Sequence, residues 1–166
     1  MAHKNKKSRK TKKVVAVSGG FDPLHIGHIR MFEEAKKHGD KLVVILNNDN
    51  WIRHKRGVEP FMPETERKEV LEALRVVDQV VLTEHPENVT DRSVSHILLK
   101  HKPHVFANGG DRDEKDSMDP TSPLYWDLEM CKKIDCKVIF NVGHGGKVQS
   151  SSWLIDKAKT KAKSKK

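Results

Sequence analysis

The chain has few of the residues that build disulfide scaffolds, membrane spans or large aromatic cores. Its 166 residues include 2 cysteines and 5% aromatic residues. No run approaches the roughly 18–20 consecutive apolar residues of a membrane-spanning helix. Cys131 and Cys136 are too few for a disulfide framework, and we expect free thiols in a reducing cytosol. We therefore predict a cytoplasmic protein with no membrane partner and a length that suits one domain.

Acidic residues are missing from both ends of the chain. Residues 1–13 carry 7 Lys/Arg, residues 157–166 carry 6 Lys, and neither segment contains Asp or Glu. The formal net charge of +9 therefore becomes −4 for the body between these tails. A nucleic-acid-binding domain carries its basic surface on the folded part, so we do not expect the body to bind nucleic acid. We predict basic tails at 1–13 and 157–166 around one domain at 14–156.

Short β-branched runs alternate with helical patterns along the body. The predicted strands cover 14–18, 42–46, 77–82, 104–107 and 137–142. The predicted helices cover 22–38, 63–74, 89–100, 124–133 and 149–158, with irregular segments at 47–60 and 112–123. Strands that are buried on both faces and joined by helices form parallel sheets. The sequence therefore predicts a Rossmann-like three-layer α/β/α sandwich with a five-stranded parallel sheet.

Ligands of such sheets bind beyond the carboxyl ends of the strands, which directs attention to the loop at 19–28. This loop reads GGFDPLHIGH. Its first two glycines allow close approach of the backbone to a ligand, and the start of the following helix suits phosphate. His25 and His28 are three residues apart and share one helix face, with Gly27 between them. Two imidazole donors aimed at one point would stabilise negative charge that develops on a triphosphate.

The strand, the GGFDPLHIGH loop and the helix together resemble the HxGH signature of the cytidylyltransferase-like nucleotidyltransferases, a branch of the HIGH superfamily. The resemblance covers about 14–154. It is closest to the heptose-phosphate adenylyltransferases and the glycerol-3-phosphate cytidylyltransferases. It implies transfer of a nucleoside monophosphate from a nucleoside triphosphate to a small phosphorylated sugar or polyol, with release of pyrophosphate.

The resemblance also implies roles for individual residues. The motif histidines contact the triphosphate and stabilise the transition state, and a family arginine on the second helix serves the acceptor side. The predicted catalytic residues are His25, His28 and Lys55. The predicted nucleotide-binding residues are Gly19, Gly20, Phe21, Gly27, Gly109, Gly110, Asp111, Lys147, Ser150, Ser151 and Ser152. The predicted acceptor-binding residues are Arg67 and Trp51.

The sequence departs from the family pattern before the last helix. Many relatives carry an arginine where this chain has GGKVQ at 145–149, and Lys147 is the residue that would supply the lost charge. Lysine is a point charge without the bidentate fork of arginine, so the nucleotide base and the acceptor stay open. Trp51 either stacks on a ligand or caps the edge of the core. Trp126 and Trp153 fall at helical positions that are typical of a core or an interface.

The same resemblance sets the expected cofactor and the competing functions. Mg²⁺ is expected to arrive with the triphosphate, with no site made by the protein alone, and Asp22 or Asp111 would help to orient it. The GGD at 109–111 favours ATP and a heptose-like phosphate. The alternatives are CTP with a glycerol or amino-alcohol phosphate, an RNA-related role, and a nucleotide-binding protein without catalysis. Relatives are often dimers, which leaves a homodimer open.

Overall fold

The computed structural model describes residues 11–109, 118–143 and 149–163. In chain order the elements in these ranges are β1 (Val14–Gly19), α1 (Ile26–Lys36), β2 (Lys41–Leu46), α2 (Asp49–Arg56), α3 (Glu64–Glu72), β3 (Gln79–Leu82), α4 (Ser95–His101), β4 (Val105–Gly109), α5 (Pro123–Lys133), β5 (Lys137–Val142) and α6 (Ser151–Lys163). The predicted pattern of strand followed by helix is therefore present throughout the body.

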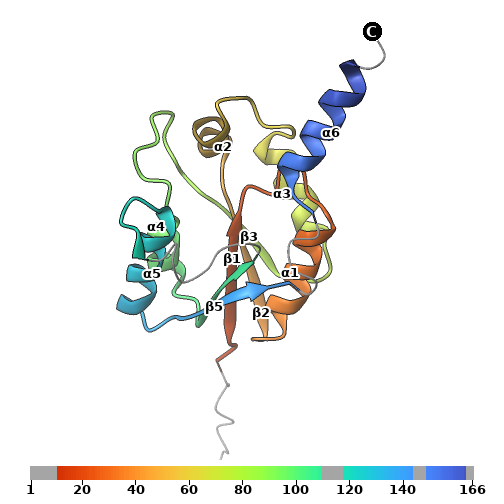
Figure 1. Cartoon of the computed structure of the whole chain (residues 1–166). Coiled ribbons are helices and arrows are strands. Elements are labelled where there is room, and N and C mark those ends of the chain that lie inside the picture. The colour runs from red at the N-terminus through yellow and green to blue at the C-terminus, as the bar shows by residue number, and fades with distance from the viewer. Residues whose placement is uncertain (1–10, 110–117, 144–148, 164–166) are drawn as a thin grey trace, which may run out of the picture.

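The strands form one sheet in the order β3-β2-β1-β4-β5. Every neighbouring pair is parallel, from Val14 beside Lys41 in β1 and β2 to Phe106 beside Val138 in β4 and β5. This arrangement confirms the predicted five-stranded parallel sheet. β1 occupies the centre, as Figure 1 shows.

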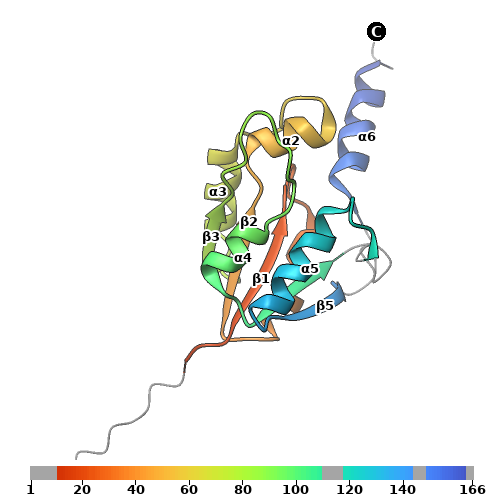
Figure 2. The same ribbon diagram turned by 90° about the vertical axis from the view of Figure 1, so that its left-hand side faces the viewer.

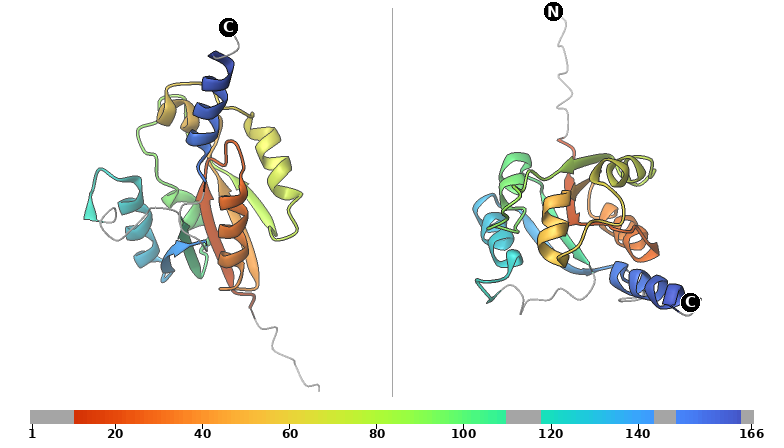
Figure 3. Two further views of the ribbon diagram at one scale, coloured as in Figure 1. Left: turned by 45° about the vertical axis from the view of Figure 1, so that its right-hand side comes forward. Right: turned by 90° about the horizontal axis from the view of Figure 1, so that it is seen from above.

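Helices cover both faces of the sheet and leave two separate cores. On one face α1 and α3 pack against β1, β2 and β3, with Phe32 and Leu71 fully buried between the layers. On the other face α4 and α5 pack against each other and over the sheet, around Leu98 and Phe106. The view from above in Figure 3 and the side view in Figure 2 show the three layers.

The order of the strands creates a switch point beside β1. The chain moves from β1 outward to β2 and β3, and it then crosses to β4 on the opposite side of β1. The connections from β1 and from β4 therefore lead to strands on opposite sides of the sheet, and ligands of such sheets bind at this point, beyond the carboxyl ends of the strands. α2 lies over this carboxyl edge, and α6 extends away from it (Figure 1).

Three helix boundaries differ from the prediction. α1 begins at Ile26 and not at Asp22, because the side chain of His25 caps the helix. α4 begins at Ser95 and not at residue 89, since Asp91 accepts from the backbone N–H and the hydroxyl of Ser93. Such local side-chain bonds compete with helical ones. α6 continues to Lys163, into the segment that was predicted as a basic tail.

α2 was missed altogether, since 47–60 was predicted to be irregular. The helix buries only Trp51 and Ile52, so its apolar stripe is too short to show a helical period. Its ends nevertheless carry signals. Asn48 accepts a hydrogen bond from the backbone N–H of Trp51 at 3.0 Å, and Gly57 ends the helix in the left-handed conformation.

Candidate active site

The loop between β1 and α1 makes a tight turn over the centre of the sheet. Phe21 adopts a left-handed backbone conformation, with φ of 49°, and its ring folds back over Gly19. A Cβ on Gly19 would lie 2.9 Å from that ring, and a Cβ on Gly20 would lie 2.6 Å from Ile52 of α2. A side chain at Gly19 would therefore displace the Phe21 ring, and one at Gly20 would move the end of the Ile52 side chain.

The two motif histidines contact each other at the N-terminus of α1. The Nδ1 atom of His25 accepts from the backbone N–H of Gly27 at 3.1 Å, and Nδ1 of His28 accepts from the backbone N–H of His25 at 3.3 Å. The rings stack with centroids 3.7 Å apart. Because each Nδ1 accepts a hydrogen bond, each neutral ring carries its proton on Nε2. The pair thus retains two Nε2–H donors for a ligand.

Burial favours the neutral form of both imidazoles. It lowers the pKa of His28 to about 3, with a further lowering by His25, and it also lowers the pKa of His25. The ring of Phe21 packs edge-on against His28 at 5.0 Å and contributes to this apolar surrounding. An anionic ligand would act in the opposite direction, since negative charge stabilises imidazolium. A polyphosphate bound beside the rings would therefore raise both pKa values.

The start of α6 lies against the histidine loop. The Ser151 hydroxyl donates to the backbone carbonyl of Pro23 at 3.0 Å. A Cβ on Gly27 would lie 3.7 Å from the carbonyl oxygen of Gln149. Ser150 caps the helix by accepting from the N–H of Trp153 at 3.2 Å, and Ser152 is exposed. Three of the predicted nucleotide-binding residues thus gather beside the histidines, although they lie more than a hundred residues away in the sequence.

Asp22, predicted to help orient Mg²⁺, holds the loop after β1 in place through buried hydrogen bonds. Its side chain is fully buried. Its carboxylate accepts from Arg56 at 2.7 Å and from the backbone N–H groups of Phe61 and Met62 at 2.8 Å each. These bonds tie the loop after β1 to the end of α2. They also engage both carboxylate oxygens, so Asp22 does not offer a free ligand to Mg²⁺.

Arg67, predicted to bind the acceptor, is 1% exposed. Its guanidinium donates to the carbonyl oxygens of Met62, Gly20 and Asn47, and to the carboxylate of Asp49 at 2.6 Å. These four acceptors occupy all three of its nitrogens. Arg67 therefore joins the loop after β1, the end of β2 and α2, with four of its five N–H groups engaged and no exposed side-chain surface for an acceptor.

Trp51 is buried, and its indole lies between two loops of the edge. Its Nε1–H donates to the carbonyl oxygen of Arg92 at 2.9 Å, and its ring packs close to Gly20. The ammonium of Lys55 lies 4.8 Å from the centroid of the same ring. Lys55 is itself exposed. Of the two predictions for Trp51, this geometry favours the one that caps the edge of the core.

Two buried amide atoms flank the end of β1. Asn47 follows β2 and Asn108 lies near the end of β4, with exposed fractions of 4% and 5%. Within the part of the chain described here, Oδ1 of Asn47 and Nδ2 of Asn108 have no hydrogen-bond partner. An unpaired buried polar atom is costly. The sequence analysis missed both residues, although an asparagine at the end of a buried strand was a usable signal.

The remaining predicted residues divide into two groups. Gly109 packs against α1 and β5, because an added Cβ would lie 2.5 Å from Met31 and 2.8 Å from the carbonyl oxygen of Val142. Gly110, Asp111 and Lys147 lie outside the described residues. Among residues 11–109, 118–143 and 149–163, no cluster of three His, Cys, Asp or Glu side chains is placed to hold a metal ion. No helix in these ranges has the length and apolarity needed to cross a membrane.

Residues 16–140 match the family described as cytidylyltransferase-like. The chain belongs to this family. It is 41% identical over 99 residues to an FAD synthase from Pyrococcus abyssi, a match that covers 60% of this chain and 64% of that protein. It is 33% identical over 131 residues to the bifunctional protein HldE from Aliarcobacter butzleri, covering 78% of this chain and 26% of that protein. The matched region thus spans less than two thirds of either relative.

The fold has a close counterpart among solved structures. The lipopolysaccharide core biosynthesis protein from Thermoplasma volcanium superimposes with a TM-score of 0.61 at 28% identity, covering 80% of this chain and 98% of that one. The family match and this superposition confirm the resemblance on which the sequence analysis relied.

Proposed function

We propose that this protein is an adenylyltransferase that moves AMP from ATP to a phosphate group of a small acceptor. The observation that carries the proposal is the stacked pair of His25 and His28 at the N-terminus of α1, beside the switch point of a parallel sheet. Membership of the cytidylyltransferase-like family supports it. ATP is favoured over CTP because the similar proteins include FAD synthases, whose product contains AMP.

The reaction is a displacement at phosphorus. An oxygen of the acceptor phosphate attacks the α-phosphorus of ATP, a new P–O bond forms, and the bond to the bridging oxygen breaks as pyrophosphate leaves. Negative charge grows on that bridging oxygen, where the Nε2–H donors of His25 and His28 would stabilise it. The reaction requires positioning and charge neutralisation and no covalent intermediate on the protein.

The nucleotide would lie across the loop after β1 and the start of α6. The N-terminal turns of α1 and α6 present backbone N–H groups, and the hydroxyls of Ser150 and Ser152 add donors beside them. Asn47 and Asn108 support a ligand over this edge, because a bound group would satisfy their buried amide atoms. The cation of Lys55 on α2 remains a candidate contact from the opposite side.

Mg²⁺ enters the proposal as part of the MgATP substrate. The described carboxylates do not fit a resident metal site, since Asp22 is engaged by Arg56 and two backbone amides. Magnesium keeps several waters and is held largely by substrate phosphates in many nucleotide enzymes. Asp111, the other predicted residue, stays a candidate for orienting it.

FMN is the first acceptor to test. It is the phosphate ester of a ribityl chain, which agrees with the predicted polyol phosphate, and its adenylylation gives FAD, the product named for several similar proteins. A heptose phosphate is the second candidate, supported by the similarity to HldE. CTP with glycerol phosphate is the third, from the family resemblance alone.

The deciding experiment measures pyrophosphate release by the full chain with Mg²⁺ and each nucleotide against each acceptor. ATP with FMN is expected to give the highest rate, and His28→Ala is expected to lower it about 10²–10³-fold. Stabilisation by MgATP without turnover on any acceptor would instead identify a nucleotide-binding protein without catalysis. Unchanged turnover in His28→Ala would contradict the assigned role of the pair.

The cellular setting and assembly stay proposals. Cys131 and Cys136 are buried free thiols, which supports a reducing compartment such as the cytosol. A homodimer, the basic segment at 1–13 and the body boundary at 156 are predictions that light scattering and limited proteolysis of the full chain would test. Loss of function on removal of both basic segments would favour the RNA-related alternative.

A further inference from the structure

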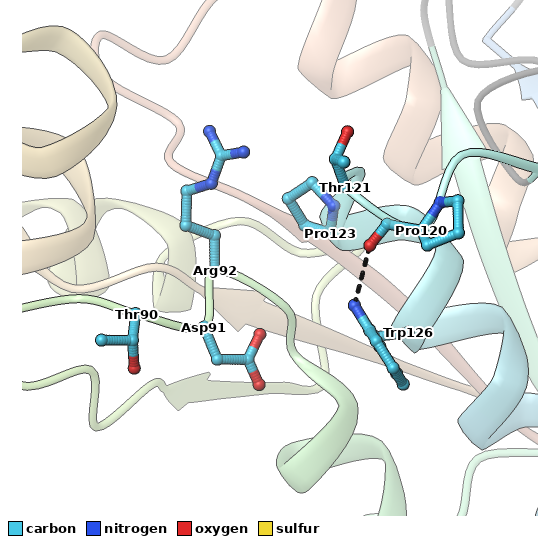
Figure 4. A pocket seen from close by; sticks show the side chains of 7 residues that line it. All are labelled: Thr90, Asp91, Arg92, Pro120, Thr121, Pro123 and Trp126. Atoms are coloured by element: carbon cyan, nitrogen blue, oxygen red, sulfur yellow. Dashed lines mark hydrogen bonds between the residues drawn. The ribbon is translucent and has the colours of Figure 1, made fainter.

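A pocket of about 450 Å³ lies on the side of the sheet covered by α4 and α5. One wall comes from the loop between β3 and α4, and the other comes from the start of α5 (Figure 4). Its lining residues are Thr90, Asp91, Arg92, Pro120, Thr121, Pro123 and Trp126. A volume of this size is typical of sites for small molecules.

The walls of the pocket are preformed. The indole N–H of Trp126 donates to the carbonyl oxygen of Pro120 at 3.1 Å, which fixes the ring along one side (Figure 4). Asp119 accepts from the hydroxyl of Thr121 at 2.7 Å. On the opposite wall, Asp91 is held by Ser93 at 2.7 Å. A site whose groups are already fixed binds a ligand with less loss of conformational entropy.

The chemistry of the lining favours a flat ring over a sugar. Trp126 is 52% exposed and offers an indole face, two prolines add apolar surface, and Arg92 extends from the opposite wall (Figure 4). Indole and guanidinium planes both stack on heteroaromatic rings. A sugar phosphate would use the threonine hydroxyls, Arg92 and Asp91, whose carboxylate Ser93 already engages, but it would leave the indole face of Trp126 and the prolines without a flat apolar partner.

One side chain connects this pocket to the loop after β1. The indole of Trp51 packs beside Gly20 at one end and donates to the carbonyl oxygen of Arg92 at the other. The pocket wall and the loop after β1 are therefore separated by a single buried indole. An acceptor with a ring at one end, a phosphate at the other and a short chain between them matches this separation.

We propose that this pocket binds the ring of the acceptor, and that the acceptor is a planar heteroaromatic phosphate of the flavin class. The inference rests on the proposed adenylyl transfer with FMN as acceptor, and it adds the place where the ring of that acceptor binds. Trp126 stacks on the ring and Arg92 contacts it from the opposite wall. The phosphate of the same molecule then extends toward His25 and His28.

The test uses FMN with the full-length protein and measures quenching of flavin fluorescence and the KM for FMN. Trp126→Leu is expected to raise the Kd and the KM for FMN about tenfold, since one base–aromatic stack contributes on this scale. Trp126→Phe retains an aromatic face and is expected to restore most of the affinity. Arg92→Gln is expected to weaken FMN binding by a smaller factor.

Trp153→Leu is the matched control, because Trp153 is 53% exposed and does not line the pocket. It is expected to bind FMN as the parent protein does. The increase in melting temperature with MgATP is expected to be equal in the parent and in both Trp126 variants. This second measurement reports on the nucleotide half of the site and on folding.

Three outcomes would overturn the inference. Equal FMN affinity in Trp126→Leu and the parent protein would show that the ring binds elsewhere. Pyrophosphate release with a heptose or glycerol phosphate, but none with FMN, would leave the proposed function intact and refute the flavin class. Absence of both nucleotide stabilisation and turnover on every acceptor would remove the proposed function, and this inference with it.

Discussion

The Nδ1 atom of His28 accepts a hydrogen bond from the backbone N–H of His25, and the two imidazoles stack with centroids 3.7 Å apart. The contact satisfies backbone donors at the start of α1 and also orients both rings. The spacing of the motif therefore serves two purposes. It caps a helix, and it leaves a pair of neutral imidazole donors at the carboxyl edge of the sheet.

The first prediction separates the charge of His28 from its hydrogen bonds. Glutamine offers an amide donor and acceptor but cannot become cationic. We expect His28→Gln to retain more turnover than His28→Ala. We also expect MgATP to bind more tightly at pH 6 than at pH 8 in the parent protein, and this increase to be lost in His28→Gln. Proton uptake on ligand binding, measured by calorimetry in two buffers, checks this directly. Equal uptake in the parent and the variant would exclude His28 as the group that gains the proton.

Stability should also depend on pH through the same residue. Burial lowers the pKa of His28 to about 3, whereas an unfolded histidine titrates near 6.5. Between these values the unfolded chain binds a proton that the folded chain excludes, so stability falls as pH falls. Above about pH 6.5 this histidine is neutral in both the folded and the unfolded chain, so no stability is lost through it. Urea unfolding at pH 7 and pH 5 should show a smaller decrease in His28→Gln, and an identical decrease would contradict the assignment.

Arg67→Met should lower the stability of the fold, because Arg67 joins three segments of the chain. Removing one partner of a buried ion pair costs about 3–5 kcal/mol, and Arg67 is buried against Asp49 and three carbonyl oxygens. We expect Arg67→Met to lower the free energy of unfolding on this scale. The exposed Arg75 provides the control, and Arg75→Met should change it by less than about 0.5 kcal/mol. A raised KM for the acceptor in Arg67→Met, with an unchanged free energy of unfolding, would instead support the predicted contact of Arg67 with the acceptor.

Asp22→Asn distinguishes a structural carboxylate from a metal ligand. The substitution weakens the contact with Arg56 and leaves an amide group facing two backbone N–H donors. We expect a lower melting temperature, by a similar amount with and without Mg²⁺. The Mg²⁺ concentration that gives half-maximal activity should not change. An increase of tenfold or more in that concentration would indicate a direct contact with the metal.

Gly27→Ala should separate activity from stability. A Cβ at this position would lie 3.0 Å from Cε1 and 3.1 Å from Nδ1 of His25, so the imidazole must move. Alanine is favoured over glycine within a helix by up to about 1 kcal/mol, which offsets part of the strain. We expect a clear loss of kcat with a change in melting temperature of only a few degrees. Retained turnover would show that His25 tolerates displacement.

Local patterns in the sequence were sufficient for much of the fold. The β-branched runs from Val14 and from Leu42 predicted buried strands, because a strand buried on both faces has no polar positions. The glycines and histidines of 19–28 predicted a phosphate-binding loop. This prediction was possible because the spacing of these residues acts within a few positions of the chain. α2 was missed because one buried turn around Trp51 leaves too little periodicity to detect.

Long-range contacts decided the rest. Neither the bond of Arg67 to the carbonyl oxygen of Gly20 nor the contact of Ser151 with Pro23 can be inferred from local sequence, since each joins segments far apart in the chain. Trp126 was predicted to belong to a core or an interface, and its place in a pocket follows only from the packing of α5 beside the loop after β3.

The sequence by itself determined the alternation of strands and helices, the histidine pair and its place after the first strand. These features depend on backbone propensity and on spacing within one turn of helix. The tertiary structure alone decided that Asp22 and Arg67 hold loops together, and that Trp51 lies between the loop after β1 and the pocket that Arg92 lines. The physical reason is that burial and hydrogen-bond partners depend on which distant segments pack together, and only the folded chain defines that packing.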